Sequence, residues 1–184
     1  MILNCRQHPL KGLLFCTLSV VLVVGCGEES RDASPTAKVG GHPGNLAPEF
    51  ALKTIKGDTL RLSDLRGNVV LVDFWATWCA PCKASMPHLQ EIHETLQDQG
   101  VRVVAVSVDR QGERVVKPFI DKHGFTFDVL LTDNKIESQF GGIQGIPTTF
   151  IIKPNGIVYK RFVGYQPKAT YLQAITALKP ELSS

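Results

Sequence analysis

Two cysteines, Cys79 and Cys82, stand three positions apart in a Trp-Cys-Ala-Pro-Cys segment, and their spacing suits redox chemistry. Two sulfurs on the first turn of a helix can close into a disulfide and open again, so they can exchange electrons with other thiols. We predict that Cys79 lies at the helix N-terminus with its sulfur exposed and attacks as a thiolate, because unpaired backbone N–H groups there stabilise negative charge. Cys82, one turn further in, is predicted to be shielded and to resolve the mixed disulfide.

The same cysteine pair allows two other interpretations. It could be an inert structural disulfide, or it could be half of a zinc site, which needs about four ligands. Downstream of the N-terminal segment, the other candidate ligands are Cys26, His42, His88, His93 and His123. His88 and His93 are five positions apart and face different sides of the predicted helix, so the pattern favours a redox dithiol. We expect no metal and no other cofactor.

Asp73 interrupts an apolar run six positions before Cys79. Burying a carboxylate is costly, so this group is expected to be hydrogen-bonded or partly protonated. Lying under the dithiol, it could take the proton from Cys82 as that thiol attacks, directly or through a water. The alternative is an ordinary core acid that is satisfied by its hydrogen bonds.

A second segment, Gly-Ile-Pro-Thr-Thr at residues 145–149, lies far downstream. A proline that opens a strand favours a cis peptide bond, although a trans turn proline is the alternative. If this loop lies beside Cys79, the free backbone of Ile146 can pair with an extended substrate, and Pro147 places no N–H group near the sulfurs.

Two tryptophans bracket the dithiol. Trp75 is predicted to belong to the core. Trp78 precedes Cys79 directly, and it could either pack in the core or offer a flat apolar surface to a partner protein.

Buried strands and one long helix must position these residues. Residues 69–75 are nearly all apolar and rich in valine, which indicates a buried strand, and helical apolar spacing follows from residue 80 to about residue 99. Further strands are predicted at residues 50–54, 59–62, 101–108, 127–131, 148–152 and 157–163. Further helices or helical turns are predicted at residues 63–67, 113–123, 133–140 and 167–178. This order indicates an α/β fold with a mixed central sheet flanked by helices and an N-terminal hairpin.

The N-terminus reads as a targeting segment. Basic residues precede an apolar run at residues 12–24, and Gly25-Cys26 follows, which resembles a bacterial lipobox. We predict a lipoprotein signal peptide at residues 1–25, a flexible tether at residues 26–45 from lipidated Cys26, and one domain at residues 46–184. The protein would be anchored to a membrane, facing the periplasm or the outer side of the cytoplasmic membrane, with the outer membrane as a further destination. An ordinary cleaved signal and an uncleaved anchor are the alternatives.

Composition agrees with one globular domain and appendages. Of the 184 residues 43% are hydrophobic and 20% charged, and the formal net charge is +3. No basic stripe with interleaved aromatic residues is present in the sequence, so nucleic acid is not an expected partner.

The chain resembles the thioredoxin superfamily in its WCAPC segment after VDFWAT and in the downstream GIPTTF. The lipobox, the LAPEFAL lead-in and the long central segment make it similar to the TlpA/ResA-like membrane-anchored thiol–disulfide oxidoreductases. The resemblance implies a thioredoxin-like fold with a central helix–strand insertion between Val108 and Pro147. It also implies a reactive Cys79, a resolving Cys82 and a cis Pro147.

The resemblance further implies an exported reductant of protein disulfides, often acting on apocytochrome c thiols and drawing electrons from a membrane protein. ResA-like members often carry a glutamate three residues after the second cysteine, whereas this chain has Ser85 there. Instead, the resemblance matches Asp73 with the buried acidic residue of plain thioredoxins.

Two other functions compete with a disulfide reductase. A thiol peroxidase of the peroxiredoxin branch would carry a threonine three residues before its reactive cysteine, where this chain has Ala76. A non-catalytic thiol- or metal-binding lipoprotein, such as a copper carrier, would favour wider-spaced cysteines and a nearby histidine.

Overall fold

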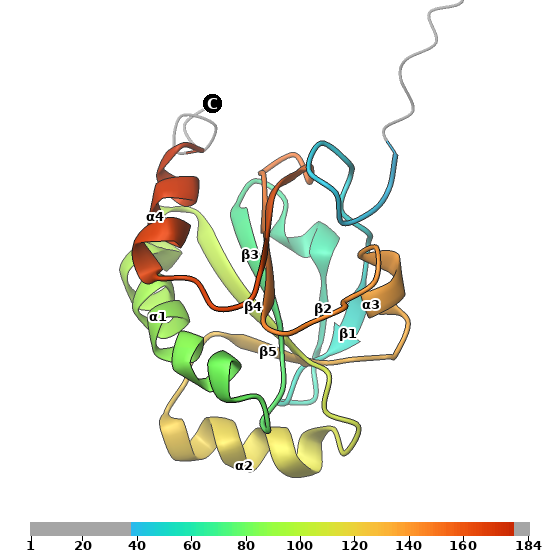
Figure 1. Cartoon of the computed structure of the whole chain (residues 1–184), viewed down its shortest axis with the longest axis vertical. Coiled ribbons are helices and arrows are strands. Elements are labelled where there is room, and N and C mark those ends of the chain that lie inside the picture. Colours follow the sequence, from blue (N-terminus) through green and yellow to red (C-terminus); the bar gives the residue numbers. More distant parts are fainter. Residues whose placement is uncertain (1–37, 179–184) are drawn as a thin grey trace, which may run out of the picture. The chain divides into compact units, whose positions relative to one another are not determined.

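The fold is built around β3 (Val69–Trp75), in which every residue is buried. The computed structural model describes residues 38–178 (Figure 1). β3 is the central strand of a five-stranded sheet with the order β5-β4-β3-β6-β7. It pairs in parallel with β4 (Val101–Ser107) on one side and antiparallel with β6 (Thr148–Ile152) on the other. The long apolar run is therefore explained by a strand that is covered on both faces.

The outer strands extend the sheet in both directions. β5 (Asp128–Leu131) pairs in parallel with β4, and β7 (Val158–Val163) pairs antiparallel with β6. The predicted mixed sheet is confirmed. Every predicted strand end lies within one residue of the observed end, because the apolar runs stop at turn residues.

Alternation along β3 assigns its side chains to two layers. Val69, Leu71 and Trp75 join the core cluster formed with α1 (Ala80–Leu96) and with the helices α2 (Glu113–His123) and α4 (Lys168–Thr176). Because successive strand residues point to opposite faces, Asp73 faces this same helical layer.

The other face is covered by shorter elements. Val70, Val72 and Phe74 pack in a second cluster. The covering elements are the hairpin of β1 (Ala51–Lys53) and β2 (Thr59–Arg61), the short helix η1 (Leu62–Leu65), and α3 (Ile136–Gln139). The N-terminal hairpin predicted from the sequence is thus confirmed.

The first described residues belong to the folded domain, which differs from the prediction of a flexible tether through residue 45. Backbone hydrogen bonds link Gly44 N to Val158 O and Val158 N to Asn45 O, each at 2.8 Å. Gly41 packs so closely against Phe140 and Phe150 that a Cβ atom there would overlap both. The polar, glycine-rich composition of this segment gave no sign that it packs on the domain, because its hydrogen bonds to the domain are made by backbone groups.

The predictions for the signal peptide at residues 1–25 and for lipidated Cys26 lie outside the described residues. Within residues 38–178, none of the helices is both long and apolar enough to cross a membrane.

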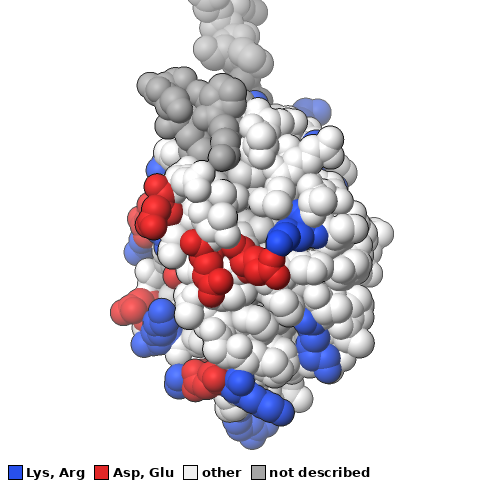
Figure 2. Space-filling model, turned by 90° about the vertical axis from the view of Figure 1, so that its left-hand side faces the viewer, with Lys and Arg blue, Asp and Glu red and all other residues white. Residues whose placement is uncertain are grey.

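Charges are mixed on the side of the molecule where α1 and α4 lie. Figure 2 shows lysine and arginine interspersed with aspartate and glutamate on this side. An ion pair between Glu91 of α1 and Lys168 of α4 joins the two helices. Exposed pairs of this kind contribute little free energy, so this pair adds little to the stability of the fold.

Candidate active site

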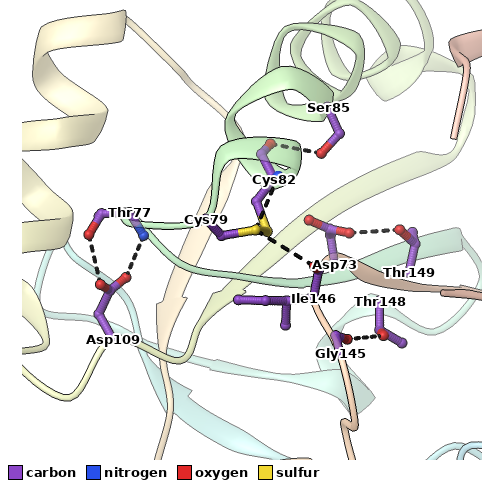
Figure 3. The surroundings of a disulfide bond; sticks show 10 residues. All are labelled: Asp73, Thr77, Cys79, Cys82, Ser85, Asp109, Gly145, Ile146, Thr148 and Thr149. Carbon is purple, nitrogen blue, oxygen red and sulfur yellow. Dashed lines mark hydrogen bonds between the residues drawn. A yellow bond between two sulfur atoms is a disulfide. The ribbon is translucent and has the colours of Figure 1, made fainter. Parts of the chain in front are cut away.

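The cysteines form a disulfide at the start of α1 (Figure 3). Cys79 is the N-cap residue of the helix, and its Sγ accepts a hydrogen bond of 3.2 Å from the backbone N–H of Cys82. Pro81 sits in the first turn, where its missing N–H is not needed. The N-terminal end of the helix therefore already directs an N–H group at the sulfur that would carry charge as a thiolate.

The two sulfurs differ less in exposure than the sequence suggested. Cys82 is fully buried, as predicted, but Cys79 is only 5% exposed, so the prediction of an exposed sulfur is wrong for the disulfide form. The carbonyl oxygen of Ile146 lies 3.7 Å from the Cys79 Sγ and covers it. Cys79 is still the more accessible of the two.

The loop at residues 145–149 lies beside the disulfide and contains a cis peptide bond between Ile146 and Pro147, as predicted. The carbonyl of Pro147 accepts a hydrogen bond from Gly164 N at 2.8 Å, and the Thr148 hydroxyl donates to Gly145 O at 2.6 Å. These bonds hold the loop at the start of β6 and the end of β7, so the sheet fixes its position beside the disulfide.

Trp75 and Trp78 occupy opposite environments. Trp75 is fully buried, whereas 68% of Trp78 is exposed. Trp78 and Ile146 line a surface depression of about 280 Å³, together with Gly145 and Glu137 of α3. The disulfide is thus bordered by an open surface that is partly apolar and partly polar.

Asp73 lies under the dithiol and is completely buried. The Thr149 hydroxyl donates a hydrogen bond of 2.7 Å to its Oδ1, while Oδ2 has no partner within the described residues. Burial raises the pKa of Asp73 from 3.8 to about 7, and the bond from Thr149 opposes part of that rise. At neutral pH this carboxyl can therefore both accept and release a proton.

Sequence reasoning did not identify two hydroxyl groups that extend from Asp73. The Tyr171 hydroxyl lies 3.0 Å from Thr149 Oγ1, and both residues are fully buried. Burial raises the pKa of Tyr171 to about 12. A threonine and a tyrosine in apolar elements were the only signal in the sequence, and neither indicates its partner.

Asp109 was also missed. It follows β4 and is almost fully buried, and its carboxylate accepts hydrogen bonds from the Thr77 N–H at 2.9 Å and the Thr77 hydroxyl at 2.7 Å. A third bond of 2.9 Å comes from the Ser107 hydroxyl. This carboxylate fixes the turn that leads into Cys79.

Replacing Asp109 by alanine is expected to destabilise the protein by about 2–3 kcal/mol, because it leaves the partly buried N–H and hydroxyl of Thr77 and the buried hydroxyl of Ser107 without their acceptor. Urea unfolding of the oxidised protein measures the change. Asp121→Ala on the exposed side of α2 is the matched control, and its expected effect is near zero. Equal stability of the two variants would contradict this account of the turn.

Ser85 is buried in α1, where its hydroxyl donates to the carbonyl of Cys82 at 2.8 Å. Ser85 thus gives the Cys82 carbonyl an additional hydrogen bond, and it has no carboxyl group. Asp73 of β3 is therefore the carboxyl group that borders the disulfide.

Histidines of α1 pack against aromatic rings, His88 on Tyr165 and His93 on Phe127. Within residues 38–178, no three His, Cys, Asp or Glu side chains are arranged to hold a metal ion.

A disulfide that closes within one helical turn, on this sheet and beside this loop, defines a thiol–disulfide oxidoreductase of the thioredoxin-like class. Known proteins agree with that class. The chain belongs to the AhpC/TSA family, whose model matches residues 43–161, and within it to the ResA-like thiol–disulfide oxidoreductases.

Three relatives illustrate the similarity. The thiol-disulfide oxidoreductase ResA of Oceanobacillus iheyensis is 45% identical over 61% of this chain and 60% of its own length. ResA of Bacillus subtilis is 33% identical over 92% of this chain and 96% of its own length. A crystal structure described as a thiol:disulfide interchange protein DsbE from Chlorobium tepidum has a TM-score of 0.70 at 34% identity and covers 75% of this chain and 98% of that one.

Proposed function

We propose that this oxidoreductase is a reductase of protein disulfides that works outside the cytoplasm, held to a membrane by a lipid on Cys26. The disulfide between Cys79 and Cys82 is the observation that carries the proposal. The charged, apolar and cysteine-ended segments of the N-terminus support export and lipidation.

The reaction begins with the reduced protein. The Cys79 thiolate attacks one sulfur of a substrate disulfide, the substrate S–S bond breaks, and the departing substrate thiolate takes a proton from solvent. Cys82 then gives its proton to Asp73 and attacks Cys79 Sγ, which releases the second substrate thiolate. Two electrons have passed to the substrate, and the protein is left with its own disulfide. A membrane electron-donor protein reduces that disulfide for the next turnover.

The surroundings of the sulfurs support a protein substrate. Trp78 offers an exposed aromatic surface beside the disulfide, and the backbone of Ile146, held by cis Pro147, can pair with an extended segment. Apocytochrome c whose thiols have been oxidised to a disulfide is the substrate that we propose, because the resemblance to ResA-like proteins implies it.

A trapping experiment tests this function. In Cys82→Ser, Cys79 can attack but the mixed disulfide cannot be resolved, so partners should accumulate as disulfide-linked complexes in the native host. We expect apocytochromes among them, and the double variant Cys79→Ser, Cys82→Ser is the matched control that traps nothing. Absence of any trapped protein would contradict a dedicated reductase. Rapid peroxide consumption by the reduced protein would support the thiol peroxidase interpretation instead.

A further inference from the structure

We propose that Thr149 and Tyr171 are positioning residues, whose hydroxyl groups form a directed chain that keeps Asp73 ionisable and aims its free oxygen at Cys82. This inference rests on the proposed role of Asp73 as the proton acceptor. It assigns a task in the reaction to two residues that lie far from the dithiol in sequence.

The fold brings the three side chains together from three elements. Asp73 and Thr149 are direct partners in the antiparallel register of β3 and β6, so their side chains project from the same face of the sheet. That face packs against α4, where Tyr171 belongs to the same core cluster as Cys82. The series of hydroxyl groups therefore lies between the sheet and the helices, and its Asp73 end is the one near the cysteines (Figure 3).

Counting protons fixes the direction of the chain. A hydroxyl group has one proton to donate. The Thr149 proton goes to Asp73 Oδ1 at 2.7 Å, so in the 3.0 Å contact Tyr171 must be the donor and Thr149 the acceptor. Both donors point toward the carboxyl, which favours its ionised form.

The same count identifies the oxygen that takes the proton. Oδ1 of Asp73 is occupied by Thr149, and Oδ2 is buried without a partner within the described residues. Figure 3 shows the carboxyl with one oxygen toward Thr149 and the other on the side of the disulfide. Oδ2 is therefore the atom that receives the Cys82 proton, directly or through a water.

An ionised carboxylate in the protein interior is usually stabilised by a neighbouring cation. Here the hydroxyl groups of Thr149 and Tyr171 take that part. On β4 the register partner of Asp73 is Ala105, which carries no charge. The titratable groups of α1 and α4 that are buried in the core cluster on this face are Tyr171 and the two cysteines. The charged side chains of the same helices, such as Lys83, Glu91 and Lys168, are not part of that buried cluster. Burial opposes ionisation of Asp73, and the donation from Thr149 is the contact that favours it.

The pH dependence of the resolving step tests the inference. A mixed disulfide is prepared between Cys79 and a thionitrobenzoate group, and release of the coloured thiolate reports the attack by Cys82 on a single turnover. In Thr149→Val the midpoint of the rate profile is expected to rise by about one pH unit. The rate below the midpoint is then about tenfold slower, while the alkaline plateau stays that of the parent.

Conservative variants separate this role from a structural one. Thr149→Ser restores the donor and is expected to keep the parent midpoint. Thr148→Val removes a neighbouring buried hydroxyl that donates to Gly145, and its midpoint should not move. Tyr171→Phe is expected to shift the midpoint in the same direction as Thr149→Val, by a smaller amount.

The outcomes distinguish the inference from the function beneath it. An unshifted midpoint in a folded Thr149→Val protein overturns the proposed role of both hydroxyl groups. An unshifted midpoint in Tyr171→Phe overturns the role of Tyr171 alone. If Asp73→Asn keeps the parent profile, the proposed role of Asp73 fails, and the inference fails with it. A reduced plateau with an unchanged midpoint shows structural damage alone and also counts against the proposal.

Discussion

Cys79→Ser is expected to lose disulfide exchange altogether, with a rate lower by on the order of 10³-fold or more, because a serine hydroxyl at its ordinary pKa is not ionised and cannot replace a thiolate. Cys82 cannot substitute for it, since its sulfur is fully buried whereas Cys79 retains some exposure. Stopped-flow reaction of the reduced variant with a protein disulfide measures the effect.

The matched control for this loss is Cys82→Ser. It keeps the attacking sulfur, so it should form the mixed disulfide at close to the parent rate and then stop. A Cys79→Ser protein that still attacked at an appreciable fraction of the parent rate would show that the order of the two sulfurs is reversed.

Asp73→Asn is expected to slow the resolving step by about 10²-fold at pH 7, the lower end of what general acid–base catalysis contributes. The amide keeps the shape of the carboxyl and can still accept the hydrogen bond from Thr149, but it cannot take a proton from Cys82. The attack by Cys79 on substrate should be unaffected. Single-turnover release from the mixed disulfide measures the step, and an unchanged rate at every pH would remove Asp73 from the reaction.

The same substitution should stabilise the protein above neutral pH. Burial raises the pKa of Asp73 from 3.8 to about 7. The folded state therefore binds this proton more tightly than the unfolded state, and the stability that the protonated group contributes is present below pH 3.8 and lost as the pH rises to about 7. The loss has an upper bound of roughly 4 kcal/mol, since each pKa unit corresponds to about 1.4 kcal/mol.

Asparagine carries no charge at any of these pH values, so the variant is spared that loss. We expect Asp73→Asn to exceed the parent by roughly 2–4 kcal/mol at pH 8 and to approach it near pH 4. Urea unfolding of the oxidised proteins at both pH values measures the difference. Asp121→Asn, at an exposed position of α2, is the control, and equal pH dependence of all three proteins would contradict a buried ionised carboxyl.

Sequence patterns were sufficient where a single segment determines its own structure. The valine-rich run predicts β3 with its observed bounds, and residues 113–123 were predicted as the helix that α2 forms. The Trp-Cys-Ala-Pro-Cys segment predicts the disulfide because both sulfurs lie on one turn. In these cases, the local period and the flanking turn residues carry the whole signal.

The remainder of the site depends on contacts between distant segments. Thr149 meets Asp73 across 76 positions, and Asp109 holds Thr77 across 32. The contact between Cys79 Sγ and the Ile146 carbonyl spans 67 positions, so from the sequence the loop could be placed beside Cys79 only as a condition. Strand alternation predicts which face a residue occupies, but it does not predict which strand pairs with which or in what register.

The two tryptophans, which are the only two in the chain, give the molecule a pair of built-in optical reporters. Trp75 is enclosed by the core and Trp78 is in water, at either end of the segment that leads into the disulfide. A soluble quencher reaches Trp78 but not Trp75, so only the fluorescence of Trp78 is quenched. A partner that docks at the redox centre would cover Trp78 and reduce this quenching. The protected emission changes when the whole domain opens, and ordinary fluorescence can thus separate recognition from unfolding without any added label.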